Sequence, residues 1–104
     1  MVKVGLIVRL EAKAGKEPEV AALLRDALPL VEDEPQTVVW LGIRTSPASF
    51  AIVDVFPDEE GRRAHLAGAV AAALTERAGD LLANPPAIER VDVLATKLGT
   101  GENT

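Results

Sequence analysis

Hydrophobic and polar residues alternate in the first segment of the chain. Over residues 2–13 the even-numbered positions from Val2 to Leu10 are all aliphatic, and most odd-numbered positions carry a charge. A period of two is typical of a β-strand that buries one face. Similar β-rich runs predict three further strands, over residues 37–44, 50–56 and 88–97. The turn residues at 45–49 predict that the second and third strands form an antiparallel hairpin.

The hydrophobic period changes after the first strand. Aliphatic residues recur every three or four positions from Val20 to Val31, behind an acidic, proline-containing segment at 17–19 that suits the first turn of a helix. Pro29 conflicts with this pattern, because it has no N–H for the carbonyl four residues earlier. The helix therefore either stops just before Pro29 or kinks there and continues toward Asp33.

A second helical region is predicted over residues 58–82. Asp58 is suited to cap its start, and the alanine-rich sequence that follows favours a helix. Gly68 indicates a break between a short helix and a longer one, and two successive prolines end the region. Charged residues at 62–63 and in the connector at 32–34 are interpreted as solvated.

The resulting order, β-α-β-β-α-β, predicts an α+β fold of the ferredoxin-like type. In this fold two split β-α-β units form one antiparallel sheet with the helices on a single face. A chain of 104 residues has room for one ordinary core. We expect a single domain over residues 1–98, followed by a frayed C-terminal tail at 99–104.

Neither face of the predicted sheet is consistently polar. In the second, third and last strands one alternating set is wholly aliphatic, and the other mixes aromatic, aliphatic and charged residues. Parity alone does not tell which set faces the helices. Because a sheet covered on one side normally has a polar open face, we expect a second copy of the chain to cover the open one. The sequence therefore predicts a homodimer in which two sheets close into a barrel-like core.

Composition and charge remove several classes of function. The chain has no cysteine and one histidine, which excludes a disulfide scaffold, a thiolate zinc site, a cysteine nucleophile and an iron–sulfur cluster. Its net charge of −5 argues against a nucleic-acid partner. The longest apolar run, residues 69–74, is far shorter than the ~20 residues that span a membrane. Charged residues also interrupt any signal-peptide core, so we expect a cytoplasmic protein without a membrane partner.

His65 is the histidine of the chain, and its side chain has an ordinary pKa near neutrality. Its neighbours at helical spacing are small, which leaves room for a ligand or for the close approach of a strand. The alternative is a structural histidine bonded to a backbone carbonyl or to Asp54. Asp54 interrupts an apolar strand, so its charge must be paired if it is buried. The available cations are His65, Arg9, Arg44 and Arg90.

All three aromatic residues lie in the central hairpin. Trp40 belongs to one strand, and Phe50 and Phe56 belong to the next. Such a patch is either ordinary core packing or a wall against which a flat aromatic ligand stacks.

Four segments resemble the antibiotic biosynthesis monooxygenase family, also described as quinol monooxygenase-like dimeric α/β-barrel proteins. These segments are VRLEAKAGKEPEVAALLRD, EPQTVVW, FAIVDVFPDEEGRRAHL and LLANPPAIERVDV, and the resemblance covers residues 4–97. It implies a cofactor-independent monooxygenase that oxidises a small quinol or polycyclic aromatic substrate, without a metal, in an apolar pocket between the sheet and the helices.

The resemblance also implies roles for individual residues. His65 would be the base or hydrogen-bond donor, with Asp54 orienting it, and Trp40 and Phe56 would be stacking walls for the substrate. The family's aromatic pair after the histidine is replaced here by residues 68–71, GAVA. Haem-degrading relatives need a histidine where this chain has Thr75, so haem chemistry is disfavoured. The alternative function is a non-catalytic dimeric module that binds a small ligand or scaffolds a partner, with a structural His65–Asp54 pair.

Overall fold

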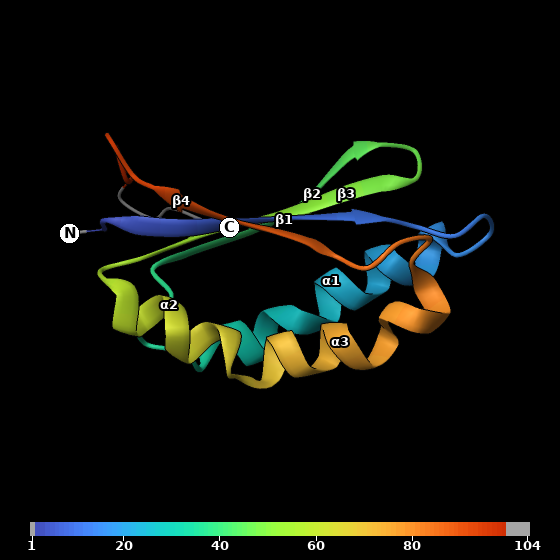
Figure 1. Ribbon diagram of the computed structural model, residues 1–104, viewed down its shortest axis with the longest axis horizontal. Coiled ribbons are helices and arrows are strands. Elements are labelled where there is room, and N and C mark those ends of the chain that lie inside the picture. The colour runs from blue at the N-terminus through green and yellow to red at the C-terminus, as the bar shows by residue number, and fades with distance from the viewer. Residues whose placement is uncertain (1, 100–104) are drawn as a thin grey trace.

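A four-stranded antiparallel sheet forms one layer of the molecule, and the computed structural model describes residues 2–99. The strand order is β2-β3-β1-β4. The strands are β1 (Val4–Glu11), β2 (Val39–Ser46), β3 (Ser49–Phe56) and β4 (Ala87–Asp92). β1 and β3 are central, and β2 and β4 form the two edges (Figure 1).

Three helices form the second layer, all on one face of the sheet (Figure 1). They are α1 (Glu17–Glu32), α2 (Glu59–Leu66) and α3 (Ala69–Leu81). The second helical region is divided at Gly68, as predicted, while α1 runs through Pro29 instead of stopping before it. The element order confirms the ferredoxin-like α+β fold with helices on one face.

The predicted last strand is too long. β4 ends at Asp92, which pairs with Val4, the first residue of β1. Beyond this point the Val93 N–H donates to the Lys3 carbonyl (2.9 Å), and Leu94 is then 94% exposed. The predicted strand extends past the end of β4, because β1 begins at Val4 and offers no further residue for antiparallel pairing beyond Asp92. The tail predicted at 99–104 lies, except for Gly99, outside the described residues.

The mixed set of side chains faces the helices. Asp54 of β3 pairs with Trp40 of β2 and with Leu6 of β1, the two neighbouring strands. Paired residues point to the same face of a sheet, so these three side chains share the helix-facing side. The main core lies beneath α1 and α3 and contains Val8, Leu10, Val20, Leu24, Phe50, Ile52 and Leu81. The aliphatic set faces the open side, where Leu41 of β2 is 51% exposed. The structure thus settles which face each set occupies and leaves exposed aliphatic side chains of β2 on the open face.

Candidate functional site

The His65 ring lies between two carboxylates. Its Nε2 is 3.0 Å from Asp54 Oδ2, and its Nδ1 is 2.5 Å from Glu34 Oε1. The Thr37 hydroxyl donates to the same Glu34 oxygen (2.7 Å). His65 is 7% exposed and Asp54 1% exposed, so the pair is shielded from water. The carboxylate–imidazole–carboxylate contact ties α2 to β3 and to the connector between α1 and β2.

Local features of α2 set the position of the ring. The Asp58 side chain caps the helix by accepting from the Gly61 N–H (3.0 Å), as its sequence position predicted. A Cβ at Gly61 would lie 3.1 Å from Gln36 Oε1 and 3.2 Å from Gln36 Cβ. Glycine at position 61 therefore lets α2 approach the connector closely enough for His65 to reach Glu34.

The two carboxylates favour the charged form of His65. Burial alone would lower the pKa of His65, but the hydrogen bonds and charges of Asp54 and Glu34 outweigh burial and raise that pKa above its ordinary value of 6.5. In the imidazolium both ring nitrogens carry a proton, and each faces a carboxylate oxygen. Such a ring has no free nitrogen that could accept a proton from a substrate.

A second buried cation holds the other side of α2. Arg62 Nη1 donates to the carbonyls of Gly5 (3.1 Å) and Val91 (3.3 Å), and Nη2 pairs with Glu59. The charge pattern of the sequence predicts that Arg62 lies on a solvated helix face. That prediction was wrong, because the Arg62 side chain is 7% exposed and turns inward to bond carbonyls of β1 and of the adjacent edge strand β4.

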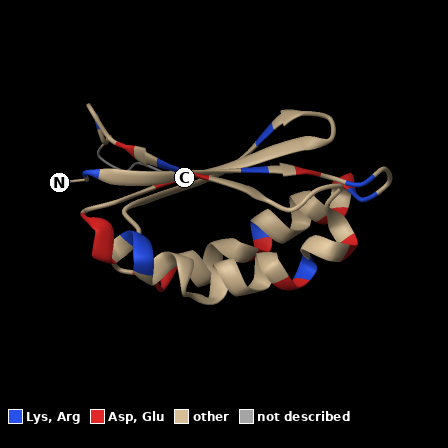
Figure 2. Cartoon of the chain, viewed as in Figure 1, with Lys and Arg blue, Asp and Glu red and all other residues tan. Residues whose placement is uncertain are grey.

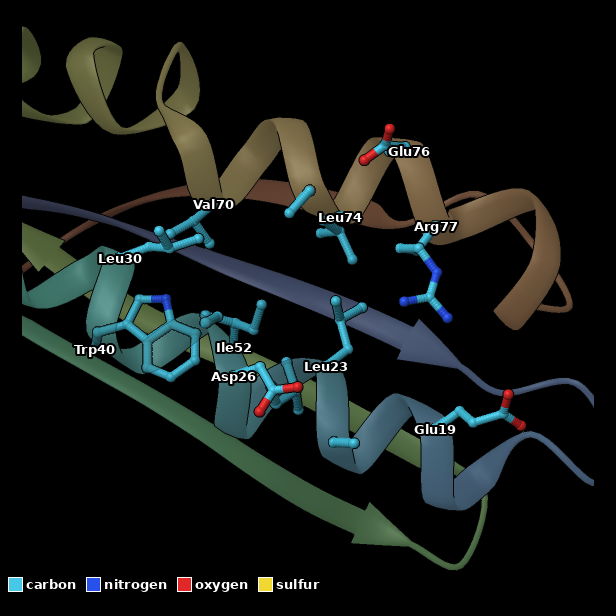
Figure 3. Close-up of a pocket in the computed structure, with 14 residues that line it drawn as sticks. Glu19, Leu23, Asp26, Leu30, Trp40, Ile52, Val70, Leu74, Glu76 and Arg77 are labelled. Atoms are coloured by element: carbon cyan, nitrogen blue, oxygen red, sulfur yellow. The ribbon is translucent and has the colours of Figure 1, made fainter.

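An apolar pocket of about 340 Å³ lies between α1 and α3, away from His65. Trp40 stands at one end of it, and Glu19 and Arg77 stand at the other (Figure 3). Its interior is almost wholly aliphatic, formed by Leu23, Leu24, Ala27, Leu30, Ile52, Val70, Ala73 and Leu74. The indole Nε1 of Trp40 is buried and has no hydrogen-bond partner among residues 2–99. The pocket is therefore an apolar cavity with one aromatic wall.

Neither a metal site nor a basic surface is evident in the described part of the chain. No three His, Asp or Glu side chains among residues 2–99 are grouped to hold a metal ion. Basic and acidic residues are interspersed along the elements in the view of Figure 2. None of the described helices is long and apolar enough to cross a membrane.

Comparison with solved structures identifies relatives of the chain. A protein of unknown function from Nitrosomonas europaea is 48% identical, with a TM-score of 0.94, and the match covers 97% of this chain and 98% of that one. The chain belongs to the family of this Nitrosomonas protein. No protein-family model matches the sequence, and no curated protein matches it.

Solved structures of lower sequence identity share the fold of this chain. A Caulobacter crescentus protein provisionally assigned as an antibiotic biosynthesis monooxygenase is 21% identical, covers 90% of this chain and 92% of its own, and has a TM-score of 0.75. A second Nitrosomonas europaea protein with the same provisional assignment is 17% identical and has a TM-score of 0.79. The match covers 88% of this chain and 90% of that one. The predicted resemblance to antibiotic biosynthesis monooxygenases is therefore shown at the level of the fold.

The structure separates the predicted site residues of this chain into two groups. His65 and Asp54 are in contact, and Phe56 is fully buried with its ring centroid 5.3 Å from that of His65. Trp40 lines the α1–α3 pocket, which none of the other three residues lines. A second, more polar pocket of about 350 Å³ adjoins His65 and is lined mainly by the connector and the start of α2.

Glu34 is the functional candidate that the sequence analysis missed. It was interpreted as part of a solvated connector, but its side chain bonds His65 and Thr37. Thr37, three residues later, is the only sequence signal that distinguishes Glu34 from its acidic neighbours, because a hydroxyl at that spacing can bond a turned-in carboxylate.

Proposed function

We propose that the protein binds a small, flat, mostly apolar molecule in the α1–α3 pocket. The observation that supports this most directly is the pocket itself, whose volume of about 340 Å³ falls in the usual range for ligand sites of roughly 300–1,000 Å³. Its lining is aliphatic with one aromatic wall, Trp40, and its charged residues are exposed at the mouth. Such a site buries an apolar ligand while leaving no charge unpaired inside.

The test is a pocket-filling substitution with a matched control. Ala73 lines the pocket, whereas Ala72 is exposed on another side of α3 and does not. Ala73→Phe is expected to abolish binding of the neutral fluorescent probe N-phenyl-1-naphthylamine, and Ala72→Phe to leave it unchanged. Equal binding by the wild type and both variants would show that the probe occupies another place and would refute the proposal.

A second candidate is cofactor-independent oxygenation of a quinol, which the shared fold favours. In this reaction an ionised quinol passes an electron to dioxygen, and the protein accepts the phenolic proton and excludes water. If His65 is the base and Asp54 orients it, its contact with Glu34 must open and Nδ1 must first release its proton, because the doubly protonated ring cannot accept another. Phe56 then supports the ring from behind.

Oxygen uptake decides between the two candidates. An oxygenase consumes dioxygen with at least one of a panel of quinols and anthrones, and His65→Ala removes that consumption without changing the mass of the assembly. A wild type that binds these compounds in the pocket but consumes no oxygen is a binding module.

We also propose that two copies associate through the open faces of their sheets. The support is the exposed aliphatic surface on that face, where Leu41 and Ile43 are half exposed and Val39, Val53 and Val55 are only partly covered. A second copy buries this surface and closes a barrel-like core. A solution mass equal to one chain at micromolar concentration would contradict the homodimer.

A further inference from the structure

A groove of about 520 Å³ lies between α1 and the edge strand β2, on the helix side of the sheet. Trp40, Gly42 and Arg44 alternate along this part of β2. They face α1, because their partners on β3 include the core residues Phe50 and Ile52. Gly42 has no side chain, so nothing on the strand fills the groove between Trp40 and Arg44.

Most of the groove is lined by apolar side chains. Leu24 and Phe50 are buried at its base, and Leu28 of α1 is 46% exposed beside it. Covering exposed apolar surface is favourable by roughly 25 cal/mol per Å², so a ligand with a hydrocarbon part gains free energy here. The volume of the groove also falls in the usual range for small-ligand sites of roughly 300–1,000 Å³.

Two arginines are the charged residues that line the groove. Arg25 comes from α1 and Arg44 from β2, so each wall carries one cation. Both are exposed, and neither forms an ion pair with a carboxylate among residues 2–99. The Arg44 guanidinium lies 5.1 Å from the centre of the Phe50 ring, a contact that orients the cation without neutralising it. No carboxylate lines the groove, although the chain has a net charge of −5.

The neighbouring α1–α3 pocket has the opposite balance of charge. Three carboxylates and one arginine line it. One of these carboxylates, Asp26, follows Arg25 in α1 but lines the α1–α3 pocket and not the groove. Leu24 and Trp40 line both sites. Charge therefore distinguishes two apolar hollows that share part of their walls.

We propose that the α1–β2 groove is a second binding site, which takes a small apolar carboxylate. The hydrocarbon part of the ligand covers the apolar lining, and Arg25 and Arg44 donate hydrogen bonds to its carboxylate. A guanidinium is planar and matches a carboxylate with two parallel hydrogen bonds. A neutral ligand lacks these ion pairs, and both arginines repel a cation. The site is separate from the one proposed above for the α1–α3 pocket.

Three matched naphthalenes test the preference for an anion. 2-Naphthoate is negative, 2-naphthamide has nearly the same shape and is neutral, and 2-naphthylmethylammonium is positive. Isothermal titration calorimetry of Ala73→Phe, in which the α1–α3 pocket is filled, measures binding to the groove alone. We expect 2-naphthoate to bind about tenfold more tightly than 2-naphthamide, as two exposed ion pairs allow, and 2-naphthylmethylammonium to bind more weakly than either.

Surface substitutions identify the arginines involved. Arg25→Gln and Arg44→Gln should each weaken binding of 2-naphthoate about fivefold, because an exposed ion pair contributes up to about that factor. Arg77→Gln is the matched control, since Arg77 is exposed and lines the α1–α3 pocket instead, and it should leave this affinity unchanged. The double variant Arg25→Glu/Arg44→Glu should bind 2-naphthylmethylammonium more tightly than 2-naphthoate.

Backbone NMR of the wild type gives a readout that does not depend on Ala73→Phe folding. Addition of 2-naphthoate to a ¹⁵N-labelled sample should shift the amide signals of Gly42 and Arg44 in β2. The amide of Ala73, which lines only the α1–α3 pocket of the two sites, should not move.

The outcomes separate this proposal from the function proposed for the α1–α3 pocket. Equal affinities for 2-naphthoate and 2-naphthamide overturn the anionic class of the ligand. A loss of 2-naphthoate binding in Arg77→Gln but not in Arg25→Gln or Arg44→Gln, with shifts at Ala73, overturns the site. Binding of N-phenyl-1-naphthylamine without binding of 2-naphthoate overturns this proposal alone, and the reverse result overturns only the function proposed for the α1–α3 pocket.

Discussion

Replacing His65 with alanine removes the positive partner of a carboxylate that has no access to water. The Asp54 side chain is fully buried, its Oδ2 contacts the His65 Nε2, and its Oδ1 has no hydrogen-bond partner among the described residues. Removing one partner of a buried ion pair typically costs about 3–5 kcal/mol, because the remaining charge is left uncompensated. Loss of the ring's contact with Phe56 adds to this cost. We expect His65→Ala to lower the free energy of unfolding by about 3–5 kcal/mol.

Urea unfolding measures this loss at one fixed protein concentration, because the proposed association of two copies would make stability depend on concentration. The double variant His65→Ala/Asp54→Asn removes the orphaned charge, so it should be more stable than His65→Ala alone. The non-additivity of the double-mutant cycle isolates the pair. A His65→Ala cost below about 1 kcal/mol, or strictly additive effects, would refute the argument that His65 neutralises Asp54.

Three further predictions follow from other features of the structure. Because the folded pKa of His65 is raised above 6.5, its stabilising contribution is fully present below pH 6.5 and is lost as pH rises through the folded pKa. Glu34→Gln should lower the His65 pKa, measured by NMR titration of the ring, and an unchanged titration would contradict the Glu34 contact. In thermal unfolding, Gly61→Ala should destabilise the fold by about 1 kcal/mol because its Cβ meets Gln36, whereas Gly79→Ala in α3, where nothing lies within 4 Å, should stabilise it by up to about 1 kcal/mol. Stability changes of the same sign in both variants would refute the close approach of Gly61 to Gln36. Leu41→Lys on the open sheet face should convert the proposed dimer to a folded monomer, as measured by analytical ultracentrifugation, and Leu28→Lys on α1, which is similarly exposed, should not. An intact Leu41→Lys dimer would exclude the open face as the dimer interface.

The sequence predicted the His65–Asp54 contact only as one of several pairings. A carboxylate within an apolar strand needed a cation, and four were available. The strand register excludes Arg9, which pairs with Ala51 on the open face, and Arg44 lies over the Phe50 ring at the far end of the hairpin. The choice of His65 thus depends on where α2 docks, which no local pattern encodes.

Glu34 could not be predicted for a different reason. It is one of three consecutive acidic residues, and which of them turns inward depends on where α1 ends. α1 continues through Pro29 to Glu32, so the connector starts later than a helix stopped at the proline would allow. The same limitation applies to the sheet faces, since alternation fixes which residues share a face but not which face the helices cover.

The separation of the two groups of candidate residues has a consequence for assigning function. His65, Asp54 and Glu34 hold α2 against β3 and the connector, whereas the Trp40 pocket is formed by α1, α3 and the hairpin. A perturbation of His65 that is only structural should therefore reduce stability and leave ligand affinity at Trp40 unchanged in the folded fraction. A loss of oxygen consumption in folded His65→Ala, with Trp40 fluorescence still reporting tight binding, would instead show that the reaction needs the ring although ligand binding does not. Stability and affinity measured on the same variant thus distinguish a structural cluster from a catalytic one.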